Sequence, residues 1–241
     1  MTKAVRRMVA GIACALSFLA TASLPAQAAP TPARTQPAPP PADVPPAFVA
    51  DACPPLPPDA DPAQWTCGNM VFDAGYIRMG RLDQPLTEPI RLTVAYGPPD
   101  QLIFGRLDSR PMRLAGLPVG VWITPEYGGH FTPTTFTELS LRFRLTGPGL
   151  GQNCHVGTVD EPIAFTMTPV AGSLRIYPLG PNGEDIVGAN YTETSFATPK
   201  ATDCNAFTPT INAILDLPSP TGRNSASFRF YLLAVNYTHL P

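Results

Sequence analysis

One stretch decides the fold: Gly147-Pro148-Gly149-Leu150-Gly151-Gln152-Asn153-Cys154-His155-Val156-Gly157. Its alternate glycines permit backbone angles that are closed to other residues, and Pro148 cannot donate a hydrogen bond to a strand ladder. The preceding residues alternate between apolar and polar side chains, as in a strand with one buried face. Their apolar members are Leu139, Leu141, Phe143 and Leu145. We therefore predict a strand at residues 136–146 that ends in a corner of an all-β domain.

Short apolar or alternating segments, bounded by glycine and proline, continue this pattern along the chain. They lie at residues 70–72, 76–79, 90–96, 102–104, 119–123, 163–168, 174–177, 185–187 and 226–236. Asp73-Ala74-Gly75 separates the first two, and Asn182-Gly183 marks a hairpin turn. Many short strands of this kind are typical of an antiparallel β-sandwich, or of a barrel-like closure.

One short helix interrupts the strands. Thr208 is suited to cap it, Pro209 occupies its first position, and Pro218 stops it. Ile211, Ile214 and Leu215 are expected to fall on one face of this helix.

Residues 1–28 have the three parts of a secretory signal peptide. Lys3, Arg6 and Arg7 precede an uncharged run at residues 8–24, and an A-x-A cleavage pattern ends at Ala28. We expect cleavage there, no transmembrane segment in the mature chain, and a secreted or cell-wall-associated product. The alternative is an uncleaved anchor, because the run approaches the roughly 18 to 20 residues that cross a bilayer.

The next segment, residues 29–63, is a Pro/Ala-rich linker that we predict to be disordered. Fourteen prolines lie between Pro25 and Pro62, and the segment lacks the apolar periodicity of a core-forming sequence. No second linker divides the remainder, so residues 64–241 are predicted to form a single β domain.

The charge balance disfavours polyanionic partners. Loss of residues 1–28 leaves 13 basic and 18 acidic residues, a net charge of −5. Nucleic acids and anionic lipid surfaces select basic proteins. We therefore expect no nucleic acid as a partner.

Four cysteines remain after the signal peptide: Cys53, Cys67, Cys154 and Cys204. An even number in an exported chain indicates two disulfides, with three possible pairings. A Cys53–Cys67 bridge would close a proline-rich loop beside Trp65. No C-x-x-C or H-x-x-x-H spacing points to a metal site, so we expect no metal and no cofactor.

Motifs for common chemistries are missing from the sequence. It has no G-x-S-x-G nucleophile elbow and no phosphate-binding glycine loop. His130 lies in the glycine-rich segment Tyr127-Gly128-Gly129-His130-Phe131 and is either a proton carrier or an ordinary loop residue. We assign no catalytic residue.

The sequence resembles a group of secreted actinobacterial proteins of unknown function. The shared motifs are G-P-x-L-G-x-x-C-x-x-G at residues 147–157, a later single cysteine, Cys204, and L-P-S-x-x-G-x-N at residues 217–224. The likeness covers residues 136–236, with His155-Val156 standing where Tyr-Ile is usual. The resemblance implies export, a β fold and a Cys154–Cys204 bridge, and it implies no activity.

Three functional hypotheses follow. The first is a non-enzymatic protein of the cell envelope or extracellular space that binds an envelope protein, glycan or lipid through its surface. The second is a carrier of an apolar or lipid ligand, with Trp122, Tyr127, His130 and Phe131 at the mouth of its cavity. The third is a wall-directed hydrolase.

Overall fold

The computed structural model describes Phe48 and residues 53–117, 120–132, 137–178 and 184–240. The chain divides into residues 1–36 and residues 37–241, and every described residue belongs to the second unit. The predicted signal peptide and most of the predicted linker therefore lie outside the described residues.

The larger sheet, sheet A, contains eight strands within the described residues and is antiparallel throughout. Its main order is β10-β12-β14-β1-β3-β4, with β11 added to β12 and β2 added to β1. The strands are β1 (Thr66–Met79), β2 (Leu82–Pro85), β3 (Ile90–Gly97), β4 (Gln101–Asp108), β10 (Thr168–Pro169), β11 (Arg175–Pro178), β12 (Asp185–Glu193) and β14 (Ser225–Asn236).

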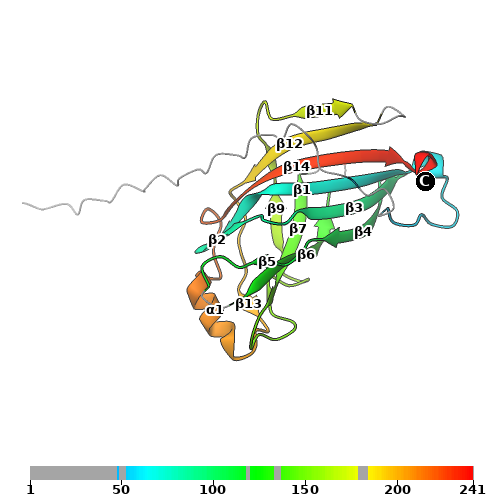
Figure 1. The fold of residues 1–241 in the computed structure, drawn as a ribbon. Coiled ribbons are helices and arrows are strands. Elements are labelled where there is room, and N and C mark those ends of the chain that lie inside the picture. Colours follow the sequence, from blue (N-terminus) through cyan, green and yellow to red (C-terminus); the bar gives the residue numbers. More distant parts are fainter. Residues whose placement is uncertain (1–47, 49–52, 118–119, 133–136, 179–183, 241) are drawn as a thin grey trace, which may run out of the picture. The chain divides into compact units, whose positions relative to one another are not determined.

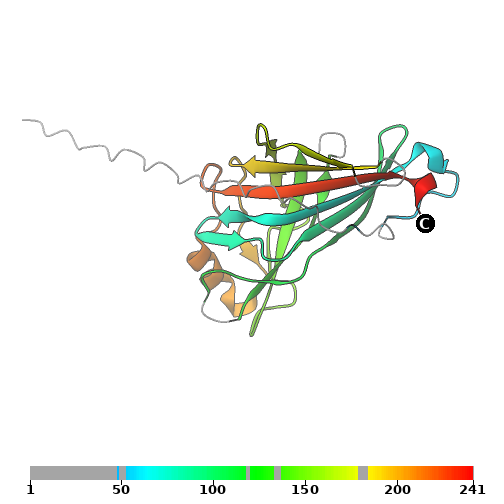
Figure 2. The ribbon, with the colours of Figure 1, turned by 45° about the horizontal axis from the view of Figure 1, so that its top comes forward.

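The smaller sheet, sheet B, contains six strands within the same described ranges. Its order is β13-β8-β7-β6-β5, and β9 pairs with β7. The strands are β5 (Met112–Arg113), β6 (Trp122–Phe131), β7 (Glu138–Thr146), β8 (His155–Val156), β9 (Ile163–Thr166) and β13 (Ala201–Thr202). Figures 1 and 2 show the two sheets as separate layers. The prediction of an antiparallel β-sandwich is thus confirmed.

Alternating side chains of both sheets fill the space between the layers. In β7, the four apolar residues predicted to share a face are at most 4% exposed, and all belong to the core. In β14, Phe228, Phe230 and Leu232 also enter the core. Aromatic edges meet there, with the rings of Phe72 and Phe228 5.6 Å apart. Burial of such side chains is the main stabilising term of the fold.

Two strands are longer than predicted. The prediction divided β1 at Asp73-Ala74-Gly75, but β1 is continuous, with a bulge between Phe72 and Ala74. Just after the bulge, Gly75 has a φ of 140°, and a Cβ there would lie 1.9 Å from the Ser227 carbonyl oxygen, so the close approach of these two strands requires glycine. Likewise, β6 extends through the glycine-rich segment to Phe131, with a register shift after Tyr127.

The predicted helix is α1 (Thr208–Leu215), which follows the 3-10 helix η3 (Asn205–Phe207). Its N-cap is Phe207 and not Thr208, whose hydroxyl instead accepts from the Cys204 amide and donates to the Asn205 carbonyl. Of the three residues expected on one face, Ile211 and Leu215 are buried, whereas Ile214 is 42% exposed. Among the described residues, no helix has the length and apolar character needed to cross a membrane.

Disulfides join Cys53 to Cys67 and Cys154 to Cys204. The first fixes the residues that precede β1 against the end of sheet A, where the Tyr237 hydroxyl donates to the Pro54 carbonyl at 2.7 Å. Burial raises the pKa of Tyr237 to about 12. The short helices η2 (Pro62–Gln64) and η4 (Tyr237–His239) lie beside each other at this end, as Figure 1 shows.

At the other end of sheet A, Asn224 joins three loops. Its Oδ1 accepts from the Gly80 amide at 2.9 Å, and its Nδ2 lies 2.9 to 3.1 Å from the carbonyls of Phe196, Ser219 and Pro220. The residue is 2% exposed. These hydrogen bonds tie Asn224 to its own turn and to two further segments.

Candidate functional site

His155, in the glycine-rich stretch at residues 147–157, lies in a charged cluster on the outer face of sheet B. His155 Nδ1 is 2.8 Å from the Asn153 carbonyl oxygen, and Nε2 is 3.2 Å from Glu126 Oε2. Both partners are acceptors, and a neutral imidazole has a single N–H, so His155 donates to only one of them in either tautomer. Glu126 also pairs with Arg142 and Arg144 at 2.9 and 3.1 Å. The cluster therefore connects β6, β7 and β8.

His130 lies near the end of β6, in contact with Glu138 at the start of β7. Its Nε2 is 3.1 Å from Glu138 Oε2, which also accepts from the Thr132 hydroxyl at 2.7 Å. The Thr132 hydrogen bond, followed by that of His130, holds the pKa of Glu138 below its ordinary value. The side chains of His130 and Glu138 are 60% and 49% exposed. This pair lies in open solvent and not in a closed, water-excluding site.

The four residues proposed for a ligand mouth do not line one opening. Trp122 and Phe131 are the first and last residues of β6, opposite Thr146 and Leu139 of β7. Phe131 is buried in the core, whereas Trp122 is 44% exposed. Tyr127 stacks on Phe104 of β4, with ring centroids 3.7 Å apart. Burial raises the pKa of the Tyr127 hydroxyl.

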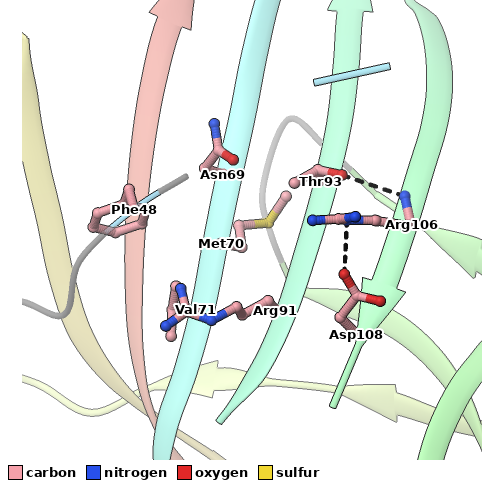
Figure 3. A pocket seen from close by; sticks show the side chains of 8 residues that line it. All are labelled: Phe48, Asn69, Met70, Val71, Arg91, Thr93, Arg106 and Asp108. Atoms are coloured by element: carbon pink, nitrogen blue, oxygen red, sulfur yellow. Dashed lines mark hydrogen bonds and ion pairs between the residues drawn. The ribbon is translucent and has the colours of Figure 1, made fainter. Parts of the chain in front are cut away.

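A first depression lies on the face of sheet A that points away from sheet B (Figure 3). Two rows of paired residues form its floor, Asn69-Thr93-Arg106 and Val71-Arg91-Asp108, and Phe48 lies beside them. Its volume of about 30 Å³ has room for little more than a water molecule. Arg106 pairs with Asp108 at 2.7 Å.

This charged surface continues into a shallower depression of about 550 Å³ that shares Arg91 and Asp108 with the first. Glu88 and Arg110 also line it, so both signs of charge are interspersed. The arrangement selects no class of ion. We do not assign a ligand to this face.

An apolar surface lies beside α1, at the end of the sandwich where residues 147–157 turn. It is an apolar depression of about 280 Å³. Its lining residues are Leu117, Val121, Pro148, Leu150, Phe207, Thr210, Ile211 and Ile214. Phe207 and Ile214 are 46% and 42% exposed, which is high for large apolar side chains that lie together.

Charge is excluded from the three segments that build this apolar depression. Residues 114–125, 145–154 and 204–215 contain no Asp, Glu, Lys, Arg or His. Depletion of charge with retained aromatic and aliphatic side chains distinguishes the centre of a binding surface from ordinary solvated surface. The apolar depression has this composition.

The fold holds these segments together by specific contacts. Gly149 has a φ of 79°, and a Cβ there would lie 2.7 Å from the Phe207 ring, so only glycine allows this approach. The Asn205 side-chain amide donates to the Gly149 carbonyl at 3.2 Å. The Asn212 side chain both accepts from and donates to the backbone of Ala201, which fixes α1 against β13.

This surface was not predicted from the sequence. The four residues proposed for a ligand mouth lie on β6, and none of them lines the apolar depression. The uncharged runs in three distant segments were the available signal, but their convergence depends on the topology.

In the described ranges, no group of three or more His, Cys, Asp or Glu side chains is arranged to hold a metal ion. Comparison of the chain with protein-family models, with curated proteins and with solved structures found no match.

Proposed function

We propose that the protein is exported to the cell envelope or extracellular space and acts there by non-enzymatic binding through the apolar depression beside α1. Two disulfides and a signal-like N-terminus support export. The single observation that carries the binding proposal is the cluster of exposed apolar side chains in three charge-free segments.

The depression suits an apolar group without backbone polar atoms. Of the described residues that line it, Thr210 alone has a polar side chain. A peptide backbone placed against these residues would leave its N–H and C=O groups without partners, which costs free energy. A hydrocarbon group makes no such demand. The apolar lining therefore favours a hydrocarbon ligand that binds at the surface. A carrier site between the sheets would instead have to displace side chains of the packed core.

Catalysis is the least favoured alternative. His155 has both ring nitrogens directed at acceptors, and His130 and its partner Glu138 are exposed. Hydrolysis of a wall glycan or ester that is abolished by His130→Ala would overturn the non-enzymatic proposal.

The binding proposal is tested with a neutral, apolar fluorescent probe such as N-phenyl-1-naphthylamine. Ile214 is 42% exposed, and full burial of such a side chain stabilises by about 1.5 to 3 kcal/mol. Covering its exposed part therefore contributes about 1 kcal/mol, and Ile214→Ser should raise Kd about fivefold.

The matched control is Ile176→Ser. Ile176 lies on β11 of sheet A and is 60% exposed, so this variant removes a similar exposed side chain from another surface. It should leave the Kd unchanged. Equal effects of the two substitutions, or no binding by the unaltered protein, would refute the assignment of the surface. N-terminal sequencing of the exported chain, expected to begin at Ala29, tests export separately.

A further inference from the structure

A polar depression is formed by two of the segments that also form the apolar one. It has a volume of about 440 Å³ and is lined by Gly151, Gln152, Asn153, Asp203, Asn205 and Thr208. The two depressions are built from the same two segments. Leu150 and Phe207 line the apolar one, and their near neighbours Gly151 and Thr208 line the polar one.

The Cys154–Cys204 disulfide fixes the two depressions in one arrangement. It joins the ends of the segments that carry them. The Asn205 amide adds a hydrogen bond to the Gly149 carbonyl, between the same two segments. A ligand that reaches from one depression to the other would therefore meet a preorganised surface, which reduces the entropic cost of binding.

The polar depression offers groups that suit hydroxyls. The side-chain amides of Gln152 and Asn153 are exposed and can both donate and accept, and the Asp203 carboxylate can accept. Among the residues that the structure describes, its lining contains no Lys or Arg. A phosphate or sulfate group would meet Asp203 without a compensating cation, so an anionic head group is disfavoured.

From these observations, we infer that the α1 end of the sandwich binds an amphiphile. Its hydrocarbon chain lies in the apolar depression, and its uncharged, hydroxyl-bearing head group lies in the polar depression. A glycolipid is the ligand class with this chemistry. The inference rests on the proposed function, because it requires the apolar depression to be a binding surface.

The experiment compares three probes by NMR of the Ile211 and Ile214 methyl groups, with the full mature chain and probes below their micelle concentrations. The probes are decyl glucoside, decyl phosphate with the same chain and an anionic head, and glucose alone. We expect decyl glucoside to bind at least fivefold more tightly than decyl phosphate, and glucose to cause no methyl shift.

Two substitutions separate the roles of chain and head. Gln152→Ala should weaken decyl glucoside about fivefold, the effect of one lost hydrogen bond, and leave decyl phosphate unchanged. Ile214→Ser should weaken both. The control Gln101→Ala removes an exposed amide from β4 of sheet A and should change neither.

The outcomes distinguish this inference from the proposed function. Equal affinities for the two decyl probes, unchanged by Gln152→Ala, would overturn the head-group assignment and leave apolar binding intact. Absence of methyl shifts with either decyl probe would overturn both. Tighter binding of decyl phosphate would replace the uncharged head group with an anionic one.

Discussion

Asn224→Ala should be among the most destabilising polar substitutions in the domain. The side chain is 2% exposed, its Oδ1 accepts one hydrogen bond, and its Nδ2 has two protons to share among three carbonyls. Three hydrogen bonds are therefore lost, each with a net contribution of about 1 kcal/mol. We expect the free energy of unfolding to fall by about 3 kcal/mol.

Asn224→Asp gives a sharper version of this test. It keeps the acceptor for the Gly80 amide, but it places a carboxylate oxygen against carbonyls that receive the Asn224 Nδ2 donor in the unaltered protein. Burial and these carbonyls disfavour the ionised form, so the pKa of the new carboxyl lies above its ordinary value in the folded state. Its folded pKa then exceeds its unfolded pKa. The variant is therefore most stable below the unfolded pKa and loses stability as the pH rises through the folded pKa.

Both variants are measured by urea unfolding of the oxidised protein, with an unchanged m-value as evidence that the denatured state is the same. Asn153→Ala, at an exposed position, is the control and should change the free energy of unfolding by less than about 0.5 kcal/mol. A loss below about 1 kcal/mol for Asn224→Ala would refute the reasoning. So would a difference between Asn224→Asp and the unaltered protein that does not grow with pH.

Three further predictions address the cross-links and ionisable groups. Replacing Cys154 and Cys204 with alanine should lower the free energy of unfolding by about 4 kcal/mol, because their sequence separation is 50; a loss under 1 kcal/mol in urea would contradict this. Thr132→Val should raise the pKa of Glu138 in an NMR carboxyl titration, because the Thr132 hydrogen bond is the largest cause of the lowered pKa. A larger rise of this pKa in His130→Ala than in Thr132→Val would contradict the prediction. The lowered pKa of Glu138 stabilises the folded state at pH values above the unfolded pKa of this residue. This stabilisation is lost as the pH falls through the folded pKa. Tyr237→Phe should remove the tyrosine that ionises near pH 12 in an ultraviolet titration. The same substitution should lower the free energy of unfolding by about 1 kcal/mol, because the hydrogen bond to the Pro54 carbonyl is lost. An ultraviolet titration that is unchanged above pH 11 would contradict the first expectation.

The sequence predicted the strands whose patterning is local. The alternation in β7 and β14 determines which side chains enter the core, since successive residues of a strand face opposite sides. The interruption predicted at Asp73 failed for a non-local reason. Asp73 forms an ion pair with Arg229 of β14 at 2.8 Å, so the residues that read as a turn continue a strand beside a distant partner.

The candidate site was much harder to predict than the strands. Helical spacing groups Ile211, Ile214 and Leu215, but it does not show how much of α1 the sheets cover. The structure leaves Ile214 exposed beside Leu150, a residue that the sequence presents only as part of a turn. The apolar depression arises because the Cys154–Cys204 bridge and Gly149 bring these segments together.

The path of β1 determines the distance between the two ends of the domain. The strand begins beside Cys53 and η4 and ends at Met79, two residues before Arg81, whose amide donates to the Leu215 carbonyl of α1. At about 3.3 Å per residue, such a strand spans on the order of 40 Å. β1 therefore separates the Cys53–Cys67 disulfide from the α1 end of the sandwich by its own length. A label attached next to Cys53 and a ligand bound beside α1 would lie at opposite ends of this single strand.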